Sequence, residues 1–246
     1  MKYASASERT VTPLYGKKTS MNRYSKITTK HPREFLLLQG QGCFHKACRF
    51  CHYYDDVSEN AFYINSEALA NVTGEFGTLD IINSGSVFEI DAESMSLIRE
   101  ISHEKNIKTI WFETHYHYKD RLDEIRDFFQ GIEIKFRTGV ESFDHTFRIS
   151  MNKGFPDVSP ETIRRNFEGV CLLVCVKGQT KKGIVNDINI AENLFEYFSV
   201  NVFCPNSTDV ELDPELYQWF KKVLYPEIKD LENCEILIDN TDLGVG

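Results

Sequence analysis

The sequence has 246 residues, of which 41% are hydrophobic and 26% charged, a composition typical of a folded protein with one large domain or two small ones. No run of 18 apolar residues could span a membrane, and residues 1–18 lack the apolar segment of a secretory signal. Seven cysteines, an odd number, do not suit a secreted disulfide framework, so we expect a cytoplasmic protein.

The formal net charge of −9 is unevenly distributed along the chain. Residues 1–33 carry eight basic residues and one acidic residue, a net charge of +7, which leaves −16 for residues 34–246. A body this acidic is poorly suited to a phosphate backbone, so the charge favours a small-molecule substrate. We expect residues 1–33 to be a basic N-terminal extension that packs on the acidic body or contacts tRNA.

Six short runs rich in Ile, Val, Leu and Phe predict buried strands, with helical patterns of apolar residues between them. Six β/α units are too few for a closed eight-stranded barrel. We therefore predict an α/β fold, a partial (β/α)6 barrel of one domain over residues 34–246, with functional loops at the carboxyl ends of the strands. The predicted strands are 34–40, 79–83, 108–112, 132–136, 171–176 and 198–203, and the helices are 92–104, 119–129, 161–169 and 185–198.

Two helix starts carry a capping signal. Asp91 is the predicted N-cap of the helix at 92–104. Ser159 is the predicted cap of the helix at 161–169, with Pro160 at its first position.

The first predicted strand leads directly into a loop with three closely spaced cysteines. Cys43, Cys48 and Cys51 have the spacing C-x4-C-x2-C. Three thiolates on a four-iron cluster leave one iron without a protein ligand, and a small chelating molecule can bind there. The alternative is a zinc site completed by His45 or His52, since thiolate and imidazole are both good zinc ligands.

Segments after the other predicted strands resemble the radical S-adenosylmethionine (radical SAM) superfamily, and in particular the elongator catalytic subunit and the radical SAM subunit of archaeosine synthase. The superfamily usually has the spacing C-x3-C-x2-C, so this chain has one extra residue between Cys43 and Cys48. Phe50 precedes the last cysteine as in the family. The matching segments are "NSGSVFE" (83–89), "WFETHY" (111–116), "RTGVESFDHTFRISMNKGF" (137–155) and "VKGQTKKGIVNDI" (176–188).

This resemblance implies a [4Fe-4S] cluster on the three cysteines and S-adenosylmethionine as a cofactor that chelates the free iron. Reductive cleavage of that cofactor would give methionine and a 5′-deoxyadenosyl radical, which removes a hydrogen atom from the substrate. It also implies an electron donor such as flavodoxin or ferredoxin. Buried carboxylates are costly unless they meet a cation or donors, which the cofactor supplies. The implied cofactor-binding residues are Phe50, Ser84, Gly85, Ser86, Glu113, Arg137 and Glu141.

Within the superfamily the chain most resembles the queuine lyase family, in its short length, the extra residue of the cysteine motif and the tail "ILIDNTDLGVG" (236–246). This implies cleavage of free queuine, a 7-deazaguanine, to 7-aminomethyl-7-deazaguanine, a step of queuosine salvage. One alternative is a radical SAM enzyme that modifies a tRNA nucleoside. The other is a zinc-binding module without enzymatic activity.

Several polar residues are candidates for contact with the substrate. A carboxylate accepts bidentately from a guanine-like edge, and Asp239, Asp242 or the carboxylate of Gly246 would do so if the tail folds into the barrel. A frayed tail with solvated acids is the alternative. The other candidates are Asp55, Asn201 and Asn206 for substrate binding, and Tyr54, His115 and His117 for catalysis.

Overall fold

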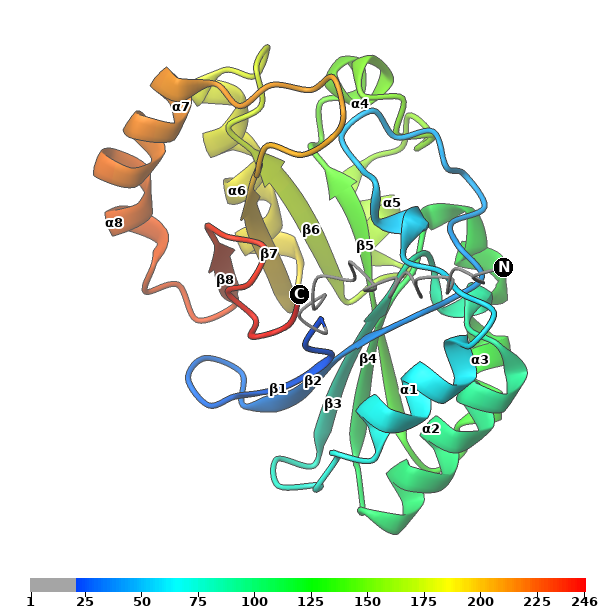
Figure 1. Ribbon diagram of the computed structural model, residues 1–246. Coiled ribbons are helices and arrows are strands. Elements are labelled where there is room, and N and C mark those ends of the chain that lie inside the picture. The colour runs from blue at the N-terminus through cyan, green and yellow to red at the C-terminus, as the bar shows by residue number, and fades with distance from the viewer. Residues whose placement is uncertain (1–20) are drawn as a thin grey trace, which may run out of the picture.

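Eight strands form one sheet in the part of the chain that the structure, a computed structural model, describes, residues 21–246. The strands stand in sequence order; β1 pairs antiparallel with β2, and every later pair is parallel. The sheet curves into an open half-barrel with helices on its outer side (Figure 1). The strands are β1 (Tyr24–Ile27), β2 (Arg33–Leu38), β3 (Thr78–Asn83), β4 (Thr109–Glu113), β5 (Glu133–Glu141), β6 (Gly169–Val174), β7 (Tyr197–Val202) and β8 (Cys234–Leu237).

The six predicted strands correspond to β2–β7, so the partial α/β barrel is confirmed, with two strands more than predicted. Both additional strands are only four residues long, "YSKI" in β1 and "CEIL" in β8, and neither has a run of apolar residues that predicts a buried strand. β1 belongs to the predicted N-terminal extension, of which residues 1–20 lie outside the described part of the chain.

Helices follow most of the parallel strands. The predicted caps are confirmed: Asp91 accepts from the Ser94 amide (2.7 Å), and Ser159 accepts from the Thr162 amide (3.3 Å). The α-helices are α1 (Ala61–Leu69), α2 (Ala92–Glu104), α3 (Leu122–Phe128), α4 (His145–Ser150), α5 (Pro160–Arg164), α6 (Lys181–Leu194), α7 (Pro214–Trp219) and α8 (Tyr225–Ile228). The shorter turns are the 3₁₀ helices η1 (Tyr53–Asp55), η2 (Val87–Glu89) and η3 (Tyr116–Arg121), and the π-helix η4 (Phe220–Leu224).

The bounds predicted for the helix at 185–198 were wrong, because α6 covers Lys181–Leu194. The helix begins earlier because Thr180 caps it by accepting from the Gly183 amide (3.0 Å). It ends earlier because Tyr197 already belongs to β7, where it pairs with Gly169 of β6.

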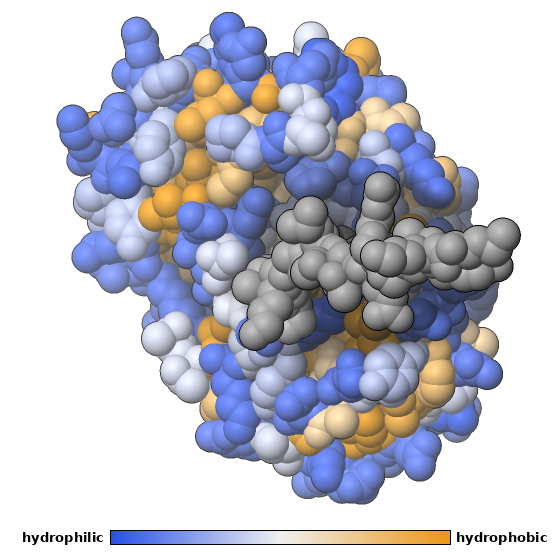
Figure 2. All heavy atoms as spheres, viewed as in Figure 1, coloured by the Kyte–Doolittle hydropathy of each residue, from blue (hydrophilic) through white to orange (hydrophobic). Residues whose placement is uncertain are grey.

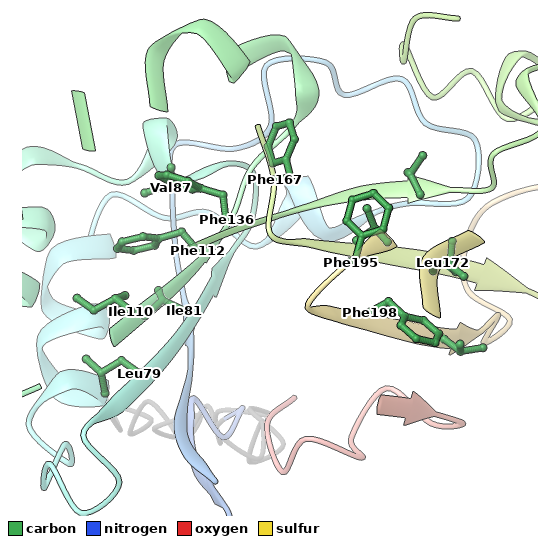
Figure 3. Close-up of a cluster of buried hydrophobic side chains, with 14 of the residues drawn as sticks. Leu79, Ile81, Val87, Ile110, Phe112, Phe136, Phe167, Leu172, Phe195 and Phe198 are labelled. Atoms are coloured by element: carbon green, nitrogen blue, oxygen red, sulfur yellow. The ribbon is translucent and has the colours of Figure 1, made fainter. Parts of the chain in front are cut away.

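Alternate residues of each strand point to opposite faces of the sheet, and the two faces differ. On the outer face, apolar side chains of β3–β7 form the main core against the helices (Figure 3). On the inner face, Phe35 and Leu37 of β2 pack with Val245 of the tail in a separate apolar patch. Charged residues share that inner face, including the fully buried Asp80. The helices of residues 21–246 include none that is long and apolar enough to cross a membrane.

The C-terminal tail lies across the open side of the half-barrel, next to the first described residues (Figure 1). The backbone of Gly246 exchanges hydrogen bonds with that of Asn22, and the Asn22 side chain donates to the carbonyl of Gly244 (2.5 Å). Figure 2 shows hydrophilic residues with hydrophobic patches between them on this face. The tail therefore folds onto the barrel, as one of the two sequence alternatives expected.

Candidate active site

The three clustered cysteines lie in the loop that leaves β2 and crosses the carboxyl ends of the strands. All three are free and partly exposed. The pKa of the Cys48 thiol is raised to about 12, mainly by burial; Lys153 opposes the shift, while Glu141 and the neighbouring Cys51 and Cys43 add to it. Because each thiol lies close enough to influence the next, the loop brings the three sulfur atoms into one environment.

A single metal ion and an iron–sulfur cluster place different demands on these thiols. Among residues 21–246, no group of three His, Cys, Asp or Glu side chains is arranged to hold one metal ion. A zinc site needs four such donors around one ion. In a four-iron cluster, each cysteine binds a different iron, so the sulfur atoms stand further apart. The donor set, three thiols and no carboxylate in the loop from Gly40 to Tyr54, fits a cluster better than a hard cation.

Glu89, which was not among the predicted site residues, joins the cysteine loop to the glycine-rich segment after β3. Its Oε1 accepts from the amide of Phe44 (2.8 Å) and from the hydroxyl of Tyr118 (3.0 Å), and its Oε2 accepts from the amide of Ser86. Gly85 leaves room for this contact. A Cβ at that position would lie 2.2 Å from Oε2 of Glu89 and 3.1 Å from the Cys43 backbone. The absence of a side chain at Gly85 thus allows the two loops to approach each other closely.

The two predicted serines of the glycine-rich segment hold neighbouring loops. Ser84 accepts from the amide of Gly40 (2.8 Å), just before the cysteine loop. Ser86 accepts from the amide of His115 (3.0 Å), just after β4. Both are almost fully buried. These hydrogen bonds join the carboxyl ends of β2, β3 and β4.

Lys153 and Glu141 form a buried ion pair beside the cysteine loop, with Nζ 2.7 Å from Oε1. The Lys153 ammonium also lies 5.6 Å from the ring centroid of Phe50, which itself packs on the apolar cluster around Phe147. Glu141 has φ +64°, a conformation that is costly for a residue other than glycine and that is often found at functional sites. Lys153 lies in the "MNKGF" segment (151–155), but its contact with Glu141 could not be predicted from the motif.

Arg137 lies deeper in the barrel than the cysteine loop and is held by carboxylates. Its Nη2 is 2.6 Å from Oδ1 of Asp80, and its Nε is 3.5 Å from Oε2 of Glu113. Asp80 also pairs with Arg33 (2.8 Å). Arg33, Asp80 and Arg137 line a cavity of about 300 Å³ at the amino ends of the strands. The Arg137 side chain therefore contacts the carboxyl end of β4 through Glu113, and its binding of a cofactor stays a prediction.

Glu113 lies at the carboxyl end of β4, and its side chain is 38% exposed. The surrounding protein raises the pKa of its carboxyl group, and Arg137 and Lys153 partly offset this. Tyr53 is 51% exposed, and partial burial, the thiol of Cys51 and Glu113 raise the pKa of its hydroxyl to about 12. Glu113 and Tyr53 therefore lie on the same side of the barrel as the cysteines.

The predicted catalytic candidates are near the cysteine loop. His115 accepts from the amide of His117 (3.1 Å), and its Nε2 lies 3.2 Å from the carbonyl oxygen of Lys153, which makes it a neutral donor. Burial and the Lys153 ammonium lower the pKa of His115 to about 3. The His117 ring stacks on Phe44. Tyr54 is in η1. These contacts do not test a catalytic role, which stays a prediction.

Among the substrate candidates, Asn201 combines a position near the mouth with an unused polar atom. It lies at the carboxyl end of β7, and its Oδ1 is buried without a partner in the described residues. The amide of Asn206, in contrast, donates to the carbonyl of Phe50 (2.9 Å) and so fastens the cysteine loop. Its oxygen accepts from the amide of Thr208 (2.9 Å).

The acidic candidates are more exposed. Asp55 is at the end of η1, with its side chain at the surface. Asp242 accepts from the amides of Ile238 (2.6 Å) and Asp239 (2.9 Å), so it stabilises its own turn. Asp239 and Gly246 are exposed, beside the Val245 side chain that is buried on the inner patch. Their contact with a substrate stays a prediction.

Comparison with known proteins supplies the family. No protein-family model matches the sequence, and no curated protein matches it. Among solved structures, the queuine lyase from Clostridium spiroforme bound to SAM and queuine is 38% identical to this chain, with a TM-score of 0.88. The match covers 92% of this chain and 100% of that one. The chain therefore belongs to the queuine lyase family of the radical SAM superfamily.

Proposed function

We propose that this protein is a radical SAM lyase that cleaves free queuine to 7-aminomethyl-7-deazaguanine. The observation that carries the proposal is the similarity, over the whole length of the other chain, to a queuine lyase bound to SAM and queuine. The three thiols, the glycine-rich segment and the two carboxylates at the same end of the barrel support it. The proposed role is salvage of the queuosine precursor in the cytoplasm, and all seven cysteines are free, which suits a reducing compartment.

The residues present fit the cofactors that the family implies. Cys43, Cys48 and Cys51 would hold a [4Fe-4S] cluster, and Glu113 and Glu141 would orient S-adenosylmethionine beside it. When bound and reduced by a donor such as flavodoxin or ferredoxin, this pair supplies a 5′-deoxyadenosyl radical, while the protein contributes position and exclusion of water. Gly85 and Glu89 keep the cysteine loop against the end of β3.

A deazaguanine with a cyclopentenediol substituent would meet polar atoms at the carboxyl ends of the strands. Oδ1 of Asn201, which has no partner among residues 21–246, and the carboxyl group of Glu113 provide acceptors for its ring N–H, amino or hydroxyl groups. A few polar atoms that fix the orientation of a ligand are typical of small-molecule sites.

The alternative of a tRNA substrate depends on the basic N-terminal extension. Four of its eight basic residues are within the described part of the chain, and all four bind groups of the protein itself. Arg23 pairs with Asp56 (2.7 Å) and Lys26 with Glu75 (2.5 Å). Lys30 donates to the carbonyl oxygen of Leu231 (2.7 Å), and Arg33 pairs with Asp80. Because these four cations already bind protein groups, they are less suited to bind tRNA phosphates, which favours free queuine as the substrate.

The test is anaerobic turnover after reconstitution with iron and sulfide. The protein is incubated with S-adenosylmethionine, a reductant and queuine, and the products are identified by mass spectrometry. We expect both 5′-deoxyadenosine and 7-aminomethyl-7-deazaguanine. C48A should abolish both products, while C234A, which changes a buried cysteine of β8, should retain them. Deoxyadenosine without the deazaguanine product would refute the proposed substrate.

A further inference from the structure

The Lys153 ammonium is a buried cation beside the loop of the clustered cysteines. Lys153 is 9% exposed, and its own carbonyl oxygen is 3.9 Å from Sγ of Cys48. Its Nζ lies over the ring of Phe50, which is between Cys48 and Cys51 in the chain. The cation is thus fixed beside the loop rather than free to move in solvent.

Three features hold the ammonium in place. Glu141 accepts from Nζ at 2.7 Å. Gly139 leaves space for the pair, since a Cβ there would lie 2.6 Å from Oε1 of Glu141 and 3.0 Å from Nζ of Lys153. Glu141 keeps its strained φ of +64° while it makes this contact. A backbone conformation that costs free energy is therefore retained where it positions the lysine.

The ammonium places a fixed positive charge beside the loop that carries the thiols. Its Nζ lies over Phe50, and the backbone of the same residue reaches Sγ of Cys48. One-electron reduction of a thiolate-bound cluster adds one negative charge beside these sulfur atoms. A positive charge nearby favours the more negative state, and nearby charge is one of the factors that set cluster potentials.

We propose that the Lys153 ammonium, held by Glu141, raises the reduction potential of the cluster and so makes it easier to reduce. This inference rests on the iron–sulfur part of the proposed function and is independent of queuine. Removal of the charge should lower the equilibrium constant for reduction of the cluster about tenfold. For a one-electron couple, this corresponds to a reduction potential lower by about 59 mV.

The test is an anaerobic redox titration followed by the electron paramagnetic resonance signal of the reduced cluster, without S-adenosylmethionine or queuine. K153M and K153Q remove the charge, and K153R keeps it. K135Q is the matched control, because Lys135 pairs with Glu196 (2.8 Å) near the opposite end of β5. We expect lower potentials for K153M and K153Q, and potentials like the parent's for K153R and K135Q.

Equal potentials in K153M and K153R would overturn the proposal. If K153M and K153Q hold no cluster while K153R holds one, Lys153 acts on cluster binding rather than on the reduction potential, and the proposal is refuted. If K153R fails as well, the role of Lys153 is structural and the proposal is refuted. If the parent holds no cluster, the proposed function itself fails, which is a separate result.

Discussion

Substitution of Asp80 by Asn tests the charged interior of the barrel. Asp80 is 1% exposed and pairs with Arg33 at 2.8 Å and with Arg137 at 2.6 Å. Asn cannot neutralise the two buried guanidinium groups. Arg33 still pairs with Glu235 at 2.6 Å, while among residues 21–246 the remaining carboxylate partner of Arg137 is Glu113 at 3.5 Å. Removal of one partner of a buried ion pair costs about 3–5 kcal/mol, because an uncompensated charge remains.

The assay is urea unfolding of the cluster-free protein in reducing buffer at pH 7. E211Q is the matched control, since Glu211 pairs with Lys177 at 2.6 Å but both side chains are about two-thirds exposed. An exposed pair contributes about 0–1 kcal/mol. We expect D80N to lower the free energy of unfolding by about 3–5 kcal/mol and E211Q by at most about 1 kcal/mol. A loss for D80N no larger than that for E211Q would refute the reasoning.

Three further predictions concern single residues. Burial raises the pKa of Asp187 to about 6. The protonated carboxyl group therefore contributes to stability at low pH, and this contribution is lost as the pH rises from about 4 to 6. D187N should reduce the difference between the free energies of unfolding at pH 4 and pH 7 by up to about 3 kcal/mol. G85A should prevent cluster loading, measured as iron per chain, whereas G131A, where an added Cβ meets nothing within 4 Å, should load normally. N201A should leave the free energy of unfolding nearly unchanged, because Oδ1 of Asn201 has no partner in the described residues. The same substitution should raise KM for queuine, and an unchanged KM would exclude contact of Asn201 with the substrate.

Much of the fold could be predicted because the inner strands are buried on both faces. The strands β2–β7 therefore carry apolar runs, and their alternation with helices indicates a parallel sheet. The edge strands β1 and β8 have no such run, and their pairing depends on β2 and β7 rather than on their own four residues. Asp80 also stood inside a predicted strand, but its partners Arg33 and Arg137 come from other strands.

The candidate site was predictable where one segment holds all its ligands, as in the cysteine loop. Glu89 and Lys153 were not selected, because their function depends on contacts with Phe44 and Glu141 that only the folded chain brings together. The same holds for Asn206, which was expected near the substrate but donates to the cysteine loop. Spacing identifies the chemistry of a ligand set, while the groups that hold it in place come from distant positions.

The central claim is radical cleavage of queuine, and the most direct test is a single anaerobic turnover experiment. Queuine carrying deuterium on its cyclopentenediol ring is incubated with the reconstituted protein, S-adenosylmethionine and a reductant. We expect deuterium in 5′-deoxyadenosine and the appearance of 7-aminomethyl-7-deazaguanine, with both absent in C48A. Formation of 7-aminomethyl-7-deazaguanine without S-adenosylmethionine, or no product from protein with a complete cluster, would contradict the account.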